Sequence, residues 1–249
     1  MGKILHEIDD FDLAGFVRVA ETFGSDRYAF VVTPNVDHLI RYFDDPSFRE
    51  HYAAASYVLM DSRFASRLVR LVKGLRLPVC PGSDLTAKLF QDSVSATDRI
   101  VLIGGSEEQA RTIAQMFALQ DLNHYNPPMG FIRDPGAVEE CLSFIEAHSP
   151  FRYCFIAVGS PQQEAVAHAL LTRGRARGLA LCVGASLNFI TGSERRAPHW
   201  MQQASIEWLY RLLQDPRRLA KRYLIRGPRF FAQLGRSEFV LRRRAGAAG

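Results

Sequence analysis

The sequence of 249 residues lacks several features that would place a protein in a class at once. It has no apolar run near the roughly 18 residues that a membrane-spanning helix needs, so we expect any membrane contact to be peripheral. It also shows no repeat of fixed period, no low-complexity tract and no Gly-x-Ser-x-Gly elbow. These absences argue against a solenoid, a disordered chain and a serine hydrolase.

Cysteine is scarce, and the four cysteines are far apart in the sequence. Cys154 and Cys182 lie in apolar runs, so we expect free thiols in the core, and no CxxC pair indicates a zinc site. The chain opens Met-Gly-Lys-Ile without an apolar signal core, and together these features predict a reducing, cytoplasmic location. A hydrophobic content of 47% is sufficient for a substantial core.

Positive charge is concentrated near the carboxyl end. Residues 215–244 hold ten lysines and arginines against Asp215 and Glu238, a net +8, so the rest of the chain carries −3 of the overall +5. Such a segment attracts an anionic partner, although a run of charge is more often only a solvated face. Aromatic residues are interleaved with the arginines, which favours a lipid headgroup layer over nucleic acid. They are Trp208, Tyr210, Tyr223, Phe230, Phe231 and Phe239.

Short apolar runs alternate with amphipathic stretches along most of the chain. This alternation predicts an α/β fold with a Rossmann-like, mainly parallel sheet flanked by helices, and ligands beyond the carboxyl ends of its strands. After Trp200 the pattern indicates helices alone, so we predict an α/β catalytic domain over residues 1–200 and a helical, basic, membrane-associating appendage over 201–249. The expected strands are Arg27–Val32, Tyr57–Met60, Arg99–Ile103, Tyr153–Val158 and Leu179–Val183. The expected helices are Val36–Phe43, Phe64–Val72, Asp84–Gln91, Glu107–Ala118, Ala137–Ala147, Gln162–Thr172, Ile206–Leu213, Leu219–Ile225 and an amphipathic stretch near Phe230–Leu241.

Polar residues follow two of these strands. Asp61 comes at the end of one, where a carboxylate facing a closed pocket could deprotonate a hydroxyl nucleophile. The alternative is that it only caps the next helix, since Asp and Ser are both favoured there. Thr33 and Asn35, on either side of Pro34, face the same choice between binding substrate and starting a helix.

Two glycine-containing strand ends are further candidates. Gly104-Gly105 would let a helix N-terminus approach a phosphate, but the full GxGxxG spacing is missing and a tight turn explains the pair equally well. The segment from Gly159 to Glu164 places two amides and a carboxylate near a strand end, which suits a sugar or uracil ring. A capped helix start explains Pro161 and Glu164 but not the two glutamines.

We predict no metal site. Asp10-Phe11-Asp12 matches the Asp-x-Asp pair of metal-dependent sugar transferases, but it precedes every expected strand and has the pattern of a helix start. The seven histidines show no paired-ligand spacing.

Taken in order, these segments resemble the WecG/TagA/CpsF glycosyltransferase family of bacterial surface-polysaccharide synthesis, over roughly Tyr28 to Arg226. The segments that carry the resemblance are Thr33-Pro34-Asn35, Pro81-Gly82-Ser83-Asp84-Leu85, Gly159-Ser160-Pro161-Gln162-Gln163-Glu164, Val183-Gly184-Ala185-Ser186, Gly192, Arg196-Ala197-Pro198, Glu207-Trp208-Leu209-Tyr210-Arg211 and Pro216. Many relatives have Ala-Asp-Gly where this chain has Met60-Asp61-Ser62-Arg63, which leaves the donor sugar open.

The resemblance implies an inverting transfer, without a metal or other cofactor, from a UDP-sugar onto a sugar linked to undecaprenyl pyrophosphate. The transfer would occur at the inner face of the cytoplasmic membrane. The donor would carry N-acetylmannosamine, its uronic acid or glucose. Asp61 would be the general base, Thr33 and Asn35 would line the active site, and Gln163 would contact substrate. Further binding candidates are Gly104, Gly105, Gly159, Glu164, Arg196, Arg211, Arg218 and Arg222.

Two other functions remain open at this point. In the first, the protein is a membrane-docked, non-catalytic nucleotide-binding scaffold whose strand-end polar residues are only caps. In the second, suggested by the sheet and Gly104-Gly105, it is a nicotinamide-dependent oxidoreductase, although the incomplete fingerprint argues against it. No nucleic-acid partner is expected, and a homo-oligomer is left open.

Overall fold

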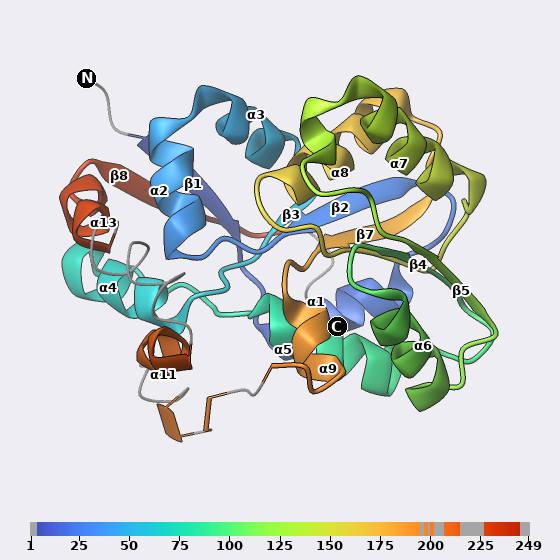
Figure 1. Cartoon of the computed structure of the whole chain (residues 1–249). Helices are drawn as coiled ribbons and strands as arrows, with labels where there is room; N and C mark the ends of the chain where they lie inside the picture. The colour runs from blue at the N-terminus through green and yellow to red at the C-terminus, as the bar shows by residue number, and fades with distance from the viewer. Residues whose placement is uncertain (1–3, 195–196, 199, 202–206, 215–226, 245–249) are drawn as a thin grey trace.

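A computed structural model describes residues 4–194, 197–198, 200–201, 207–214 and 227–244 (Figure 1). Its centre is a six-stranded sheet with the order β3-β2-β7-β6-β4-β5, in which every pair of neighbours is parallel. The predicted α/β, Rossmann-like fold is therefore confirmed. The strands are β2 (Tyr28–Val32), β3 (Tyr57–Val58), β4 (Arg99–Ile103), β5 (Asp121–Tyr125), β6 (Tyr153–Ile156) and β7 (Gly178–Cys182).

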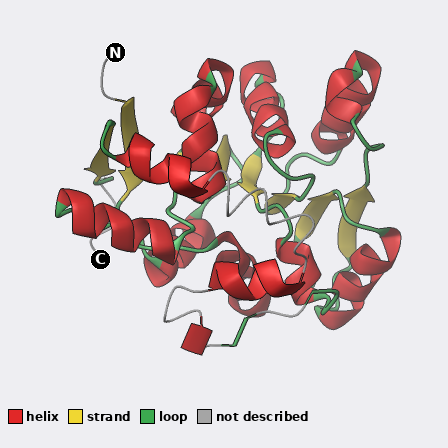
Figure 2. Cartoon of the chain, turned by 60° about the vertical axis from the view of Figure 1, so that its left-hand side comes forward, coloured by secondary structure: helices red, strands yellow, loops and turns green. Residues whose placement is uncertain are grey.

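Helices cover both faces of this sheet (Figures 1 and 2). Alternate strand residues supply the two cores: Phe30 and Val32 pack on one side, and Ala29 and Val31 on the other. The central strands are buried on both faces, which explains why they are apolar throughout. The first side is covered by α2 (Val36–Asp44), α3 (Pro46–Ala54), α4 (Arg63–Lys73), η2 (Phe131–Arg133), α7 (Pro135–Ala147) and α8 (Gln162–Arg173). The second is covered by α1 (Leu13–Thr22), α5 (Gly82–Lys88), η1 (Leu89–Ser93), α6 (Glu107–Met116) and α9 (Ser186–Ile190).

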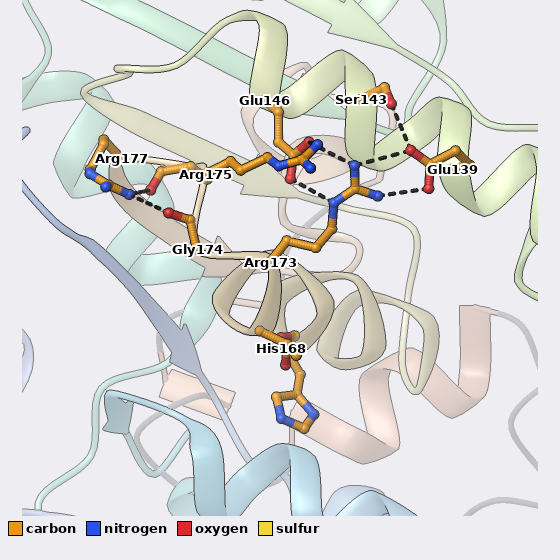
Figure 3. Close-up of polar contacts among 10 residues, drawn as sticks. Glu139, Ser143, Glu146, His168, Arg173, Gly174, Arg175 and Arg177 are labelled. Carbon is orange, nitrogen blue, oxygen red and sulfur yellow. Dashed lines mark hydrogen bonds and ion pairs between the residues drawn. The ribbon is translucent and has the colours of Figure 1, made fainter.

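Polar contacts fix the neighbouring helices α7 and α8 against each other. Arg173, at the end of α8, donates to Glu139 at 2.7 Å and to Glu146 at 2.9 Å, both on α7 (Figure 3). On the other side of α8, His168 lies with its Nδ1 atom 2.9 Å from Nδ1 of His51 on α3. Helix α8, whose first turn carries the glutamines singled out above, is thus held from both sides.

The two ends of the described chain meet in a second sheet. Strands β1 (Ile4–Asp9) and β8 (Ser237–Arg242) pair in parallel, with His6 opposite Phe239. This corrects two expectations: Asp10-Phe11-Asp12 follows a strand, and the segment after Trp200 is not helical throughout. Both strands are short and half buried, so their apolar residues also fit a helical pattern, and only the partner strand decides between the two.

The remaining differences have local causes. Asp12 caps α1 by accepting from Gly15 N at 2.8 Å, which confirms the helix start expected there. Strand β5 was not predicted because it is a partly exposed edge strand of polar residues. Helix α3 was also missed.

Within the described residues, no helix is both long and apolar enough to cross a membrane.

Beyond Trp200 the structure describes α11 (Glu207–Gln214), α13 (Gly227–Leu234) and β8. The expected helix Leu219–Ile225 lies outside the described residues. Helix α13 packs on α2, while β8 pairs with β1, so this part of the chain returns to the body near its N-terminal strand. The division at residue 200 stays a prediction.

A buried carboxylate joins this C-terminal strand to the main sheet. Asp9 is fully buried, and its Oδ2 accepts from the backbone N of Val58 at 2.7 Å and from Arg242 at 2.8 Å. Its Oδ1 accepts from Nε of Arg244 at 2.7 Å. The N–H of Val58, which points away from β2 at this edge of the sheet, is thus paired by a side chain.

Candidate active site

Asp61 lies three residues beyond the end of β3, at the carboxyl edge of the sheet. Its backbone N donates to Pro34 O at 3.0 Å, and its Oδ1 accepts from Gly82 N at 2.8 Å. The cap of the following helix is Ser62, whose side chain accepts from Ala65 N. The interpretation of Asp61 as a helix cap is therefore wrong, because its neighbour fills that role.

Thr33 lies beside the same backbone amide. Its side chain is buried, and Oγ1 donates to Cys182 O at 3.4 Å, at the end of β7. A Cβ atom placed on Gly82 would come within 2.9 Å of Thr33 Oγ1, so only glycine fits between the two residues without a shift. The structure thus brings Thr33 and Asp61 together around the first turn of α5, as the strand-end pattern indicated.

The sequence did not predict that the backbone N–H of Gly82 donates to Asp61. The motif Pro81-Gly82-Ser83-Asp84-Leu85 contributed to the resemblance, but a backbone N–H has no residue-type signal of its own. Asp84, from the same motif, accepts from Arg63 at 2.9 Å, and both side chains are partly buried. Arg63, the first residue of α4, is therefore paired with this motif.

Asn35 is placed at the same edge, as the N-cap of α2. Its Oδ1 accepts from Asp37 N at 3.0 Å and from His38 N at 3.3 Å. The structural alternative for Asn35 thus holds, since it starts the helix. A contact with substrate stays a prediction.

Gln163 and Glu164 lie in the first turn of α8 and are buried, with 2% and 0% of their surface exposed. Gln163 Oε1 accepts from Gly184 N at 2.9 Å, and its Nε2 donates to Glu164 Oε1 at 3.0 Å. Both ends of the amide are therefore paired inside the protein. Gln163 fixes the turn that follows β7, next to the carbonyl that Thr33 contacts.

Burial raises the pKa of Glu164, an effect that donation from Gln163 partly opposes. His38 Nδ1 lies 3.9 Å from Glu164 Oε1 and 2.9 Å from the hydroxyl of Tyr52. Arg41, one turn further along α2, donates to Ser160 Oγ at 2.8 Å. Polar contacts therefore join α2 and α3 to the loop that precedes α8.

Gly104, Gly105 and Gly159 all have positive φ angles, between 77° and 89°. A Cβ on Gly104 would lie 3.0 Å from the backbone of Ala157, which accounts for this glycine by packing alone. Gly159 differs, because a Cβ there would meet nothing within 4 Å. At the start of α6, after Gly105, a capping box of Ser106 and Gln109 pairs backbone N–H groups of the first turn. Glu107 and Glu108 add negative charge to the same turn, which does not favour an anion. A phosphate-binding role for Gly104-Gly105 stays a prediction.

Comparison with known protein families gives a match over almost the whole chain. A family described as "Glycosyl transferase WecG/TagA/CpsF family" matches residues 3–244. The chain belongs to this family. It is accordingly a glycosyltransferase of the kind that takes part in cell-surface polysaccharide synthesis, with a sugar-nucleotide donor and a lipid-linked acceptor.

The arginines among the predicted substrate-binding residues of this glycosyltransferase lie mostly outside the described residues. Arg196, Arg218 and Arg222 lie outside the described residues. Arg211 belongs to α11, but its side chain is not among those described. The roles of all four stay predictions.

Three further observations bear on the chemistry of this family member. No group of three or more His, Cys, Asp or Glu side chains within the described ranges could hold a metal ion, and independence from metals stays a prediction. All four cysteines are buried free thiols, as expected. A cavity of about 300 Å³ also lies behind Pro34, lined in part by His6, His38, Tyr42 and Arg242. Asp61 is not part of its wall, so we do not assign it to the transfer.

Proposed function

We propose that this glycosyltransferase is inverting and metal-independent, and that it moves a sugar from a UDP donor to a sugar linked to undecaprenyl pyrophosphate. Asp61 is the general base. The observation that carries this assignment is the position of its carboxylate, at the carboxyl edge of the sheet and oriented by the N–H of Gly82 rather than used as a helix cap. In parallel α/β sheets this edge is where ligands bind.

The proposed reaction is a single displacement. An acceptor hydroxyl oxygen attacks the anomeric carbon of the donor while Asp61 takes the hydroxyl proton, and the bond between that carbon and the UDP oxygen breaks. The electron pair of that bond leaves with UDP. Because attack comes from the face opposite the leaving group, the configuration inverts. Without a metal, backbone N–H groups and arginines stabilise the departing diphosphate.

Thr33 and Gln163 have different parts in this proposal. Thr33 lies next to the Gly82 amide that orients Asp61, and it helps to place the attacking hydroxyl. Gln163 contacts substrate only if its bond to Gly184 N opens, so in the closed arrangement it acts by shaping the loop after β7. Glu164, held beneath it, positions the amide.

The reaction takes place at the inner face of the cytoplasmic membrane, because the acceptor is bound to lipid. The basic C-terminal segment is proposed to bind anionic lipid there. Among the cations of this segment that the structure describes, Arg242 and Arg244 bind Asp9, and Arg243 lies 3.5 Å from Asp10. We therefore assign docking to the cations before Ser237.

The substitution Asp61→Asn tests the assignment directly. The amide oxygen can still accept from Gly82 N, so the fold should be kept, whereas the base is lost. We expect kcat to fall by roughly 10² to 10⁴ with an unchanged melting temperature. Asp121→Asn is the matched control, because Asp121 lies on the opposite edge strand and pairs with Arg99. Transfer by Asp61→Asn within a factor of about ten of wild type would contradict a general base.

Two assays identify the substrates. A panel of UDP-sugars carrying N-acetylmannosamine, its uronic acid or glucose, offered with a short lipid-pyrophosphate acceptor, shows which donor is consumed. Consumption of any donor in this panel separates an enzyme from the non-catalytic, nucleotide-binding scaffold. Thermal melts with UDP and with NAD identify the class of donor, because a bound ligand raises the melting temperature. Stabilisation by NAD and not by UDP would overturn the proposed donor class.

A further inference from the structure

Helix α4 and the loop after it form an unusually basic stretch outside the C-terminal segment. Between Arg63 and Ser83 the sequence contains five cations and no Asp or Glu. They are Arg63, Arg67, Arg70, Lys73 and Arg76. In a chain whose part before residue 215 is net negative, such a stretch indicates a local anionic partner.

The structure separates this stretch into a buried and an exposed face. Ala65, Ser66 and Val69 face the core. On the opposite face Arg70 is exposed, and Leu71 next to it has 82% of its surface exposed. Val72 follows with 52% exposed. Two aliphatic side chains thus project into solvent among cations at the end of one helix.

Helix α13 extends this face. Lys73 Nζ donates to Gly235 O at 3.2 Å, and the rings of Phe64 and Phe231 lie 6.4 Å apart, so the two helices are neighbours on the same side of the molecule (Figure 1). Phe231 has 54% of its surface exposed, and Arg229 is also exposed. A third apolar group and another cation therefore join the end of α4.

We propose that this face docks on the surface of an anionic lipid bilayer. The α4–α13 surface, as we define it, comprises Arg70, Leu71, Val72, Lys73, Arg76, Arg229 and Phe231. Its cations attract lipid phosphates, and its exposed apolar side chains enter the boundary between headgroups and acyl chains. A nucleic acid would use the same cations, but its phosphate backbone gives no binding role to exposed Leu71 and Val72.

This surface connects docking to the site, an inference that rests on the proposed transfer to a lipid-linked acceptor. Helix α4 begins two residues after Asp61 and ends in the proposed docking surface. At 1.5 Å per residue, Leu71 lies about 12 Å along the helix axis from Arg63, the first residue of α4. Docking of its far end would hold Asp61 at a set height above the membrane, where a diphosphate-linked sugar projects.

Co-sedimentation with vesicles tests the proposal on the full-length protein. Phosphatidylglycerol-containing vesicles are compared with pure phosphatidylcholine vesicles for four variants of the chain. Leu71→Gln with Val72→Gln removes the apolar tips, and Arg70→Gln with Arg76→Gln removes two cations without touching the Lys73 contact. The controls are Met129→Gln, a fully exposed apolar residue after β5, and Arg111→Gln with Arg175→Gln, which removes one cation from α6 and one from the loop after α8.

We expect binding to anionic vesicles to fall roughly 25-fold for the cation variant, at about fivefold per cation, and roughly tenfold for the apolar variant. The controls should bind like wild type, and transfer to a water-soluble short-chain acceptor should be unchanged in all variants. Equal vesicle binding by all variants would overturn the proposal. The proposal would also be overturned if the surface variants bound a DNA or RNA duplex more weakly than wild type but bound vesicles as wild type does.

Because sedimentation needs no catalysis, the docking surface and the proposed function fail separately. Loss of vesicle binding in a protein that consumes no UDP-sugar would support the surface and sink the reaction. If the protein does transfer sugar but the Leu71 and Val72 variant binds vesicles normally, the proposed reaction is supported and the docking surface is refuted.

Discussion

Replacing Asp9 by alanine should destabilise the protein far more than its distance from Asp61 suggests. The side chain is fully buried and accepts from Val58 N, Arg242 and Arg244. A buried N–H left unpaired costs about 1 to 3 kcal/mol, and a hydrogen bond from a charged donor contributes about 1.5 to 3 kcal/mol. Arg244 is more than a third exposed, so its bond is discounted to at most about 1 kcal/mol.

Together these terms predict a loss of about 2.5 to 7 kcal/mol in the free energy of unfolding, which is a large part of a typical total. Urea unfolding followed by circular dichroism measures it, and the melting temperature should fall by roughly 5 to 28 °C. Asp9→Asn keeps an acceptor for Val58 N and loses only the charge, so it should cost about 1 to 2 kcal/mol.

Asp10→Ala is the matched control. The Asp10 side chain is 35% exposed, and its carboxylate lies 3.5 Å from Arg243, whose side chain is 89% exposed. That pair should contribute no more than about 0.5 kcal/mol. If Asp9→Ala were as stable as Asp10→Ala, the buried carboxylate would not be what holds the C-terminal strand to β3.

Two further predictions concern pH and backbone shape. Burial lowers the pKa of His6 from 6.5 to about 4, so the unfolded chain binds the extra proton between these values and stability falls as the pH drops through this window. The loss is about 3 kcal/mol by pH 4, and His6→Gln should flatten the dependence of the urea midpoint on pH; an unchanged slope would contradict it. Gly104→Ala should cost more than Gly159→Ala, because both have positive φ but only Gly104 has backbone within 3.0 Å of a Cβ. Both lose about 1 kcal/mol from strain, and equal melting temperatures for the two variants would refute the packing explanation.

Much of the site could be predicted because each of its side chains follows an apolar strand. Parallel strands end at one edge, so Thr33 and Asp61 had to lie near each other once the alternation of strands and helices was recognised. The choice between base and cap for Asp61 could not be made in the same way. Ser62 is also a favoured cap, and only the hydrogen bonds to Ala65 and Gly82 show which residue does which.

The C-terminal strand shows the same limit over a longer distance. Ser237–Arg242 is short and alternates weakly, and its partner lies more than 230 residues away, so no local pattern decides between helix and strand. From the sequence, the arginines of this segment indicated a basic tail that binds an anionic partner. In the structure Arg242 and Arg244 instead bind a carboxylate that sequence analysis had no reason to single out.

By itself, the sequence determined the class of fold, the order of most elements and the family, because these depend on local periodicity and on short motifs whose spacing is visible along the chain. The tertiary structure alone decided which charges are already paired and which are exposed. Arg242 and Arg244 meet Asp9 only through the pairing of β1 with β8, whereas Arg70 and Leu71 project outward because Ala65 and Val69 fill the core. Burial and charge pairing depend on contacts between distant segments, which a linear pattern does not contain.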